Sequence, residues 1–216
     1  MKKILIFGTG GHAKVILDII SNEQKYEIAG FIDNELDEGQ EVLNHKVLGA
    51  DKDLISLIKK NSIFGGVIAV GNNYSREKIS QEINNLCEDF NFINCIHSQA
   101  QIAMDVSIGA GNVLMAGSVV NTSTSIGNHC IVNTNSSLDH DNSMLDFSSI
   151  APNSATGGNV KIGKLSALGI GSTILPGISV GPNSIIGAGS LVLEDIPSDS
   201  IYFGSPAKFI RKNLID

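Results

Sequence analysis

The chain has no tryptophan, few other aromatic residues and little charge. Aromatic residues make up 5% and charged residues 17% of its 216 positions, whereas hydrophobic residues make up 42%. Disordered chains show the opposite balance, so a folded protein is expected. Few charges and few aromatics, together with 23 glycines, fit a β-rich repeat better than a helical bundle. The net charge of −7 argues against nucleic acid or an anionic membrane as the main partner.

Long apolar runs and regularly spaced cysteines are also missing. No stretch approaches the roughly 20 apolar residues that span a membrane. The opening MKKILIFGTGG has only a short apolar run and no cleavage site, unlike a signal peptide. Cys87, Cys95 and Cys130 match neither a disulfide framework nor the spacing of metal ligands. We therefore expect a cytoplasmic protein with reduced thiols and no bound metal.

Residues 1–95 alternate strand-like and helix-like segments. The run KILIFG is almost wholly apolar, as expected of a strand buried on both faces, and HAKVILDIISN has apolar residues at helical spacing. Strand–helix–strand order predicts a small parallel α/β sheet, a Rossmann-like half in size. The expected strands are 3–8, 26–33 and 65–73, and the expected helices are 12–22 and 74–87.

From residue 96 onward the sequence follows a period of six. Every sixth residue from Ile102 to Val192 is apolar, with Thr156 as the one exception. Glycine often follows the apolar residue, and a small residue often stands four places after it. Such a period arises when short strands and tight turns stack as a β-helix, with three six-residue units in each triangular coil. Residues 96–216 are therefore predicted to form a parallel β-helix, covering roughly residues 96–205, followed by a C-terminal tail.

The glycines of GTGGHAK stand between the first strand and the first helix. Backbone N–H groups in such a loop can face a phosphate, and Gly8-x-Gly10-x-x-Ala13 approaches the dinucleotide fingerprint. Asp33 stands at the end of the second strand, where a ribose-binding acid is found in dinucleotide folds. The same glycines also suit an ordinary tight turn, and the half-domain is too short for NAD.

The segment SSLDHDNSM places His140 between Asp139 and Asp141 within the repeat. His140 follows the inward Leu138 by two positions, so it should point outwards near an edge of the prism. It is either a solvated surface residue or a base whose tautomer and basicity are set by Asp141. His129 has no acidic neighbour and is expected at the surface.

The whole arrangement resembles the hexapeptide-repeat sugar acetyltransferases that include sialic-acid O-acetyltransferases and bacillosamine-pathway N-acetyltransferases. The resemblance rests on the repeat, on GTGGHAK, FIDN and AVGNN, on the histidine–acid pair and on the tail FGSPAKFIRK. It covers essentially the whole chain. It implies a left-handed β-helix, acetyl-CoA as co-substrate, direct transfer without a covalent enzyme intermediate, and a homotrimer with the cofactor groove between neighbouring prisms.

The resemblance also implies roles for particular residues. His140 would be the general base, with Asp141 as its partner and the Gly158 N–H as a donor to the developing oxyanion. Gly158, Ile170 and Ala188 would contact the cofactor. His12 equally suits an exposed helix start. The residues expected to hold the nucleotide-sugar ligand are Gly10, Gly11, His12, Asp33, Asn34 and Gly71.

Two positions depart from the family pattern. Asn34 stands where the amino-sugar branch has a second acid, and Ser149 stands where many relatives have a second histidine. The leading hypothesis is N-acetylation of the 4-amino group of a UDP- or dTDP-linked amino-deoxysugar. O-acetylation of a sialic or other nonulosonic acid is the alternative, followed by a non-catalytic partner of a sugar-biosynthesis enzyme. A nucleotidyltransferase is disfavoured because the α/β half is short.

Overall fold

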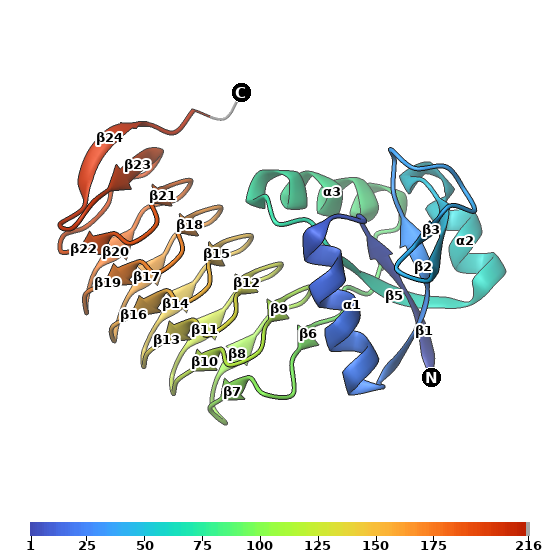
Figure 1. The fold of residues 1–216 in the computed structure, drawn as a ribbon, viewed down its shortest axis with the longest axis horizontal. Coiled ribbons are helices and arrows are strands. Elements are labelled where there is room, and N and C mark those ends of the chain that lie inside the picture. Colours follow the sequence, from blue (N-terminus) through green and yellow to red (C-terminus); the bar gives the residue numbers. More distant parts are fainter. Residues whose placement is uncertain (215–216) are drawn as a thin grey trace. The chain divides into compact units, whose positions relative to one another are not determined.

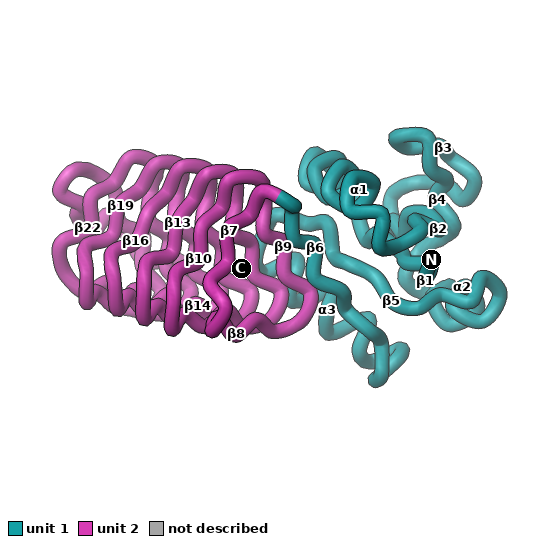
Figure 2. Tube along the Cα trace, turned by 90° about the horizontal axis from the view of Figure 1, so that it is seen from below, with its two compact units in different colours: residues 1–98 teal, residues 99–216 magenta. Residues whose placement is uncertain are grey.

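The computed structural model describes residues 1–214 of the chain. Two compact units, Met1–Ser98 and Gln99–Asp216, follow one another in the sequence (Figure 2). The boundary between the units, after Ser98, lies three residues beyond the boundary predicted from the sequence, between residues 95 and 96. None of the helices within residues 1–214 combines the length and the apolar character that crossing a bilayer requires.

Unit 1 is an α/β unit. Its elements are β1 (Lys2–Phe7), α1 (Gly11–Glu23), β2 (Tyr26–Ile32), β3 (Glu41–Val42), β4 (His45–Gly49), the 3-10 helix η1 (Asp51–Asp53), α2 (Leu54–Asn61), β5 (Ile63–Ile68), α3 (Asn73–Leu86) and β6 (Cys95–Ile96). Five strands form one sheet in the order β3-β4-β2-β1-β5 (Figure 1). In this sheet, β4 pairs with β2, β2 with β1, and β1 with β5, all in parallel as predicted. The edge strand β3 is antiparallel to β4. The segments from β3 to α2 were missed because they are too short for a clear period.

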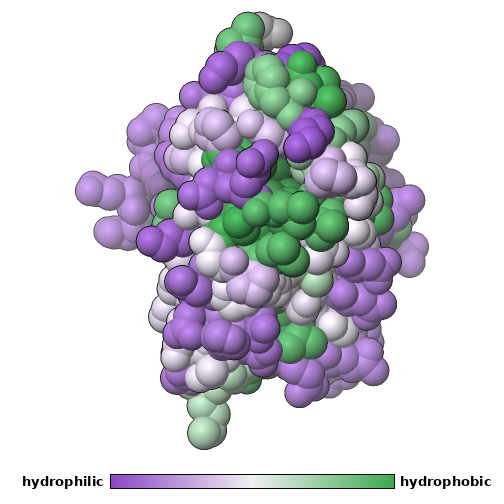
Figure 3. Space-filling view, turned by 90° about the vertical axis from the view of Figure 1, so that its left-hand side faces the viewer, coloured by the Kyte–Doolittle hydropathy of each residue, from purple (hydrophilic) through white to green (hydrophobic). Residues whose placement is uncertain are grey.

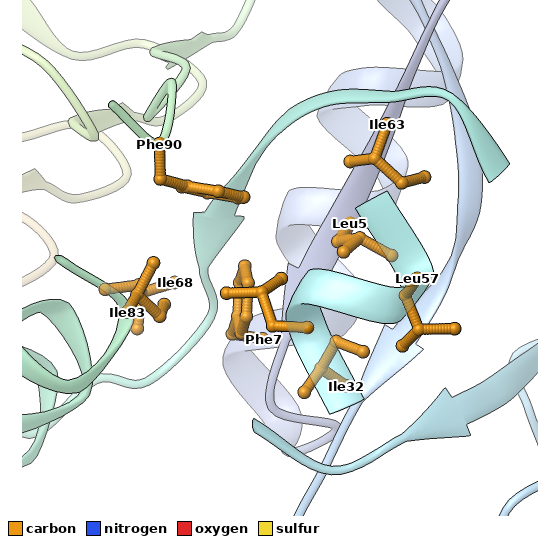
Figure 4. Packing of buried hydrophobic residues seen from close by; sticks show 9 residues of the cluster. Leu5, Phe7, Ile32, Leu57, Ile63, Ile68, Ile83 and Phe90 are labelled. Carbon is orange, nitrogen blue, oxygen red and sulfur yellow. The ribbon is translucent and has the colours of Figure 1, made fainter. Parts of the chain in front are cut away.

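The core of unit 1 joins the sheet to the helices beside it. Phe7 of β1 and Ile68 of β5 belong to one buried cluster with Leu57 of α2 and Ile83 of α3 (Figure 4). Phe7 meets the ring of Phe90 edge to face, with 5.6 Å between the ring centroids. Each buried side chain of this size contributes roughly 1.5–3 kcal/mol. This packing fixes the carboxyl ends of the central strands, where the loops of the first candidate site begin.

Unit 2 stacks two-residue strands in three parallel sheets. In chain order the strands are β7 (Gln101–Ile102), β8 (Ser107–Ile108), β9 (Val113–Leu114), β10 (Val119–Val120), β11 (Ser125–Ile126), β12 (Ile131–Val132), β13 (Ser137–Leu138), β14 (Ser143–Met144), β15 (Ser149–Ile150), β16 (Ala155–Thr156), β17 (Lys161–Ile162), β18 (Ala167–Leu168), β19 (Thr173–Ile174), β20 (Ser179–Val180), β21 (Ile185–Ile186) and β22 (Leu191–Val192). Each strand from β7 to β19 pairs in parallel with the strand 18 residues further along the chain, as β10 does with β13. Asn128 and Asp146, also 18 residues apart, are joined by a hydrogen bond. Three strands therefore make one coil, and unit 2 is the predicted left-handed parallel β-helix (Figure 1).

Residues in the left-handed backbone conformation form the three corners of the prism. Glycine, asparagine and aspartate tolerate this conformation best, which explains the small polar residues of the repeat. Corner A contains Gly117, Asn135, Asn153, Gly171 and Gly189; corner B contains Ser123, Asp141, Asn159 and Gly177; corner C contains Gly111, His129, Phe147, Leu165 and Asn183.

The stack ends in the hairpin of β23 (Ser200–Phe203) and β24 (Lys208–Lys212), whose turn and second strand come from the tail FGSPAKFIRK. Leu193, Phe203, Phe209 and Ile210 are all exposed in this part of the chain. Figure 3 faces this end of the stack and shows apolar side chains gathered between polar ones. Apolar surface thus remains where the coils end.

Candidate functional sites

Unit 1 contains a cleft of about 460 Å³ at the carboxyl ends of its central strands. The loops after β1, β2 and β5 line it, together with Asp51 of η1. Ligands of parallel α/β sheets bind at this edge, because the loops there converge. All the residues predicted to hold the nucleotide-sugar ligand line this cleft, namely Gly10, Gly11, His12, Asp33, Asn34 and Gly71.

The glycine loop presents the start of α1 to the cleft. Gly8 has φ +97°, a conformation that favours glycine, and Gly10 is the residue that precedes α1. A Cβ atom at Gly10 or Gly11 would meet nothing within 4 Å, so both glycines border open space. The first N–H groups of a helix carry partial positive charge. The loop can therefore accept the phosphate groups of a nucleotide.

His12 and Arg76 lie behind this loop. Among the described residues, the buried Nε2 atom of His12 has no hydrogen-bond partner. Burial, followed by the charge of Arg76, lowers the pKa of His12 to about 4, so His12 is neutral at pH 7. Arg76 is 1% exposed and donates to the carbonyl oxygens of Val70 and Gly71, both at 3.0 Å. Arg76 thus holds the loop after β5 in place.

Acidic residues also line the cleft. Asp33 accepts hydrogen bonds from the Thr9 hydroxyl at 2.7 Å and from the backbone N–H of Glu35 at 2.9 Å. Asn34 donates to Asp51 through Nδ2 at 2.6 Å and accepts from the Asp51 backbone N–H at 3.0 Å. Asp51 was not predicted, because it follows β4, a strand that the periodicity of the sequence does not reveal. Asn34 is held by a partner that sequence position alone does not indicate.

The second candidate site is at corner B of unit 2. The Nδ1 atom of His140 lies 2.7 Å from Oδ2 of Asp141, and the His140 side chain is 55% exposed. Asp141 has φ +59°, which turns its carboxylate back beside the imidazole. Oδ1 of Asp139 accepts the backbone N–H of His140 at 2.9 Å. With Nδ1–H donating to Asp141, the Nε2 atom carries the lone pair.

Two carboxylates act on the proton affinity of His140. The hydrogen bond to Asp141 is the largest influence and the charge of Asp139 the next, and together they raise the pKa of His140. The interactions of Asp139 with Asn121 and with the His140 backbone lower the pKa of Asp139, so this carboxylate stays ionised. A histidine of raised pKa is a stronger base once it has lost its proton.

Gly158 lies against the imidazole ring. A Cβ atom built on Gly158 would stand 2.5 Å from Nε2 of His140, so only glycine leaves room for the ring there. The N–H of Gly158 makes no hydrogen bond within the described part of the chain, whereas the equivalent N–H of His140 is bound by Asp139. The site thus combines a base and an unused backbone donor.

The residues expected to bind the cofactor are not all beside His140. Ile170 is 58% exposed and precedes Gly171 of corner A. Ala188 follows one coil later on the same corner, where the Gly189 N–H donates to the Ile170 carbonyl at 2.8 Å. Ser149 lies in β15, in a different sheet from β13, which leads to His140. Within one chain, His140 and Ile170 therefore stand at two different corners.

The expectation that His129 lies at the surface was wrong. His129 is only 5% exposed, and its ring stacks on that of Phe147 with 4.9 Å between centroids. Both residues occupy corner C, one coil apart, and Gly111 in the preceding coil leaves room for the histidine ring. Neighbours 18 residues away decide this burial, and the residues adjacent in sequence do not reveal it. His129 belongs to the packing of the corner.

Comparison with known proteins identifies the family. A family model described as the PglD N-terminal domain matches residues 3–83. PerB from Caulobacter crescentus, solved with CoA and GDP-perosamine, matches with a TM-score of 0.91 and 31% identity over 98% of each chain. The acetyltransferase domain of PglB from Neisseria gonorrhoeae, solved with acetyl coenzyme A, matches with a TM-score of 0.89 and 33% identity, covering 97% of this chain and 99% of that one.

A curated sequence agrees with these structures. The UDP-N-acetylbacillosamine N-acetyltransferase of Bacillus subtilis is 33% identical over 119 residues, which are 54% of this chain and 52% of that protein. The match thus spans about half of this relative, whereas the structural matches span both units. The chain belongs to the PglD-like family of hexapeptide-repeat sugar N-acetyltransferases.

Proposed function

We propose that the chain transfers the acetyl group of acetyl-CoA to the 4-amino group of a nucleotide-linked amino-deoxysugar, with His140 as general base. The observation that carries the proposal is the pair formed by His140 and Asp141 at 2.7 Å, next to the unused N–H of Gly158. A base and a backbone donor side by side are what acyl transfer to an amine requires. We retain the cytoplasm as the proposed location.

The chemistry follows from the atoms at corner B. Acetyl-CoA supplies an acetyl thioester. Nε2 of His140 accepts a proton from the sugar amine as the amine attacks, while the Asp141 carboxylate holds Nδ1–H and stabilises the imidazolium. The Gly158 N–H donates to the carbonyl oxygen on which negative charge develops. The C–S bond of the thioester then breaks, and the CoA thiolate leaves and takes the proton from the His140 imidazolium, so no cysteine or serine nucleophile is needed.

The cleft of unit 1 fits the nucleotide part of the acceptor. Its glycine loop suits a diphosphate, and the Asp33 carboxylate suits ribose hydroxyls. Related proteins act on different nucleotides, since the Bacillus relative is named for a UDP sugar and PerB was solved with GDP-perosamine. The proposal therefore extends to GDP sugars, which the sequence analysis did not consider.

The proposed assembly is a homotrimer. His140 stands at corner B and the exposed Ile170 at corner A, so a groove that uses both residues is built most simply between two neighbouring prisms. Three-sided prisms close naturally about a threefold axis.

PerB variants with a single histidine replaced have been solved with CoA and GDP-perosamine, which supports the importance of one histidine in that relative.

The test is the release of free CoA thiol from acetyl-CoA by the purified protein. UDP-, dTDP- and GDP-linked 4-amino-sugars and free sialic acid are offered separately. Thiol release with an amino-sugar nucleotide, and a product heavier by one acetyl group, supports the proposal. Release with sialic acid alone indicates O-acetylation instead. No release with any acceptor, together with no binding of acetyl-CoA, indicates a non-catalytic partner.

A further inference from the structure

The hydrogen-bond ladder of the β-helix is interrupted at one place, directly before His140. In each coil, the residue after an inward side chain donates its N–H to the carbonyl of the inward residue one coil later. Every such residue from Ala103 to Leu175 follows this rule within the described chain, except Asp139. The Asp139 N–H instead meets the hydroxyl of Thr156 at 3.3 Å. The strands β13 and β16 accordingly pair only through Ser137 and Ala155.

The interruption coincides with the one polar residue among the inward positions. Thr156 is 6% exposed, and its position is otherwise filled by apolar side chains throughout the stack. A buried hydroxyl is costly unless it is hydrogen-bonded. That of Thr156 accepts from Asp139 N–H and from Nδ2 of Asn142, the latter at 3.1 Å. The hydroxyl therefore takes the place of the backbone carbonyl as the acceptor.

Asn142, two residues after His140, also bonds to the residues around the missing ladder bond. Its side chain is almost fully buried, and Nδ2 also donates to the carbonyl oxygens of Asp139 at 2.6 Å and of Gly157 at 3.1 Å. Its Oδ1 accepts the Val160 N–H at 2.7 Å. One amide thus ties the turn that carries His140 to the strand end that precedes Gly158.

We propose that Thr156 and Asn142 are positioning residues that hold the Asp139 backbone off the regular ladder, at the start of the turn, and so place the His140 imidazole against Gly158. This inference rests on the proposed function, because it assigns the two residues to the same reaction. Neither side chain touches the space outside corner B, since both are buried. They act on the reaction only through the place of the His140 ring.

The decisive variant is Thr156→Val, which keeps the shape of the side chain and removes the hydroxyl. The Asp139 N–H is then free to pair with the carbonyl of residue 156, as in the other coils, and the Asp139 backbone that leads into His140 moves towards the ladder. A misplacement of about 1 Å in a catalytic group can cost roughly 100-fold in rate. We expect kcat to fall roughly 10- to 100-fold, with both KM values and the melting temperature close to those of the wild type.

Two further variants separate positioning from general stability. Thr156→Ser keeps the hydroxyl and should retain most of kcat. Ser166→Ala removes another buried hydroxyl, which donates to the Gly181 carbonyl at 2.7 Å, and should leave kcat unchanged. A kcat of Thr156→Val equal to that of the wild type overturns the inference. So does a loss in Thr156→Val that is matched in Ser166→Ala and follows the melting temperature.

A crystal structure of Thr156→Val gives a test that does not depend on activity. We expect the Asp139 N–H to bond the backbone carbonyl of residue 156 and the His140 ring to leave its place against Gly158. An unchanged ring position contradicts the inference. If the wild type transfers no acetyl group to any acceptor, the proposed function fails, while this structural comparison still decides whether Thr156 positions the ring.

Discussion

Replacing Gly158 with alanine tests the geometry of corner B with a single methyl group. The new Cβ would stand 2.5 Å from Nε2 of His140, whereas ordinary contacts begin at 3.4 Å. The ring must therefore retreat by roughly 1 Å, and it can do so cheaply because it is exposed. The backbone of Gly158 is not in the left-handed region, so alanine adds no backbone strain. Stability should stay nearly unchanged.

The expected loss is in the rate of transfer. A displacement of about 1 Å in the general base corresponds to roughly 100-fold in kcat, or about 2.7 kcal/mol of transition-state stabilisation. The variant keeps the backbone N–H of residue 158, so the donor to the oxyanion remains. Thiol release from acetyl-CoA measures kcat, and a thermal melt of the same sample measures stability.

A double-mutant cycle shows whether the methyl group acts through the ring. In a His140→Ala background, Gly158→Ala should have little further effect on the residual rate, because the displaced ring is gone. An equal loss in both backgrounds would mean that the methyl group disturbs something other than His140. A Gly158→Ala enzyme with wild-type kcat would refute the placement of the ring against Gly158.

The remaining predictions concern the same two sites. His140→Ala should lower kcat by roughly 10²–10⁴-fold in the thiol assay and leave acetyl-CoA affinity, measured by calorimetry, nearly unchanged. Asp141→Asn removes the main cause of the raised pKa of His140, so the acid limb of the pH–rate profile should shift to lower pH as kcat falls; an unmoved limb contradicts this role. Asp33→Ala should raise KM for the nucleotide sugar and not KM for acetyl-CoA in steady-state kinetics. His12 has a depressed pKa, so the melting temperature should fall as the pH drops from 6.5 towards 4, less steeply in His12→Asn.

The fold was predictable because its strongest signal is a period. An apolar residue at every sixth position over many coils indicates stacked turns. The strands β7–β22 follow that spacing without an insertion. The same period marked Thr156 as an exception, yet only the structure shows that its hydroxyl replaces a backbone acceptor. His129 was misplaced because its neighbour Phe147 is 18 residues away and the sequence gives no sign of ring stacking.

The candidate sites were predictable in part. Glycines and an acid at strand ends indicated the cleft, because parallel strands bring their carboxyl ends together. Asp51 was missed because the strand before it is short, and the buried nitrogen of His12 depends on side chains from several elements. The raised pKa of His140 has two sources, and the pairing of Asp139 with Asn121, from the preceding coil, could not be inferred from SSLDHDNSM alone.

The 18-residue offset between paired strands has a consequence for how such chains can change in length. Inserting or deleting one complete coil leaves every inward residue inward and every corner at its corner, and it alters the stack by about 4.8 Å. A change of six or twelve residues keeps the apolar period but moves every later residue to another corner, and a change that is not a multiple of six turns apolar side chains outwards. The separation between His140 and the last coil can therefore vary in evolution only in whole steps, while the geometry at corner B is inherited intact.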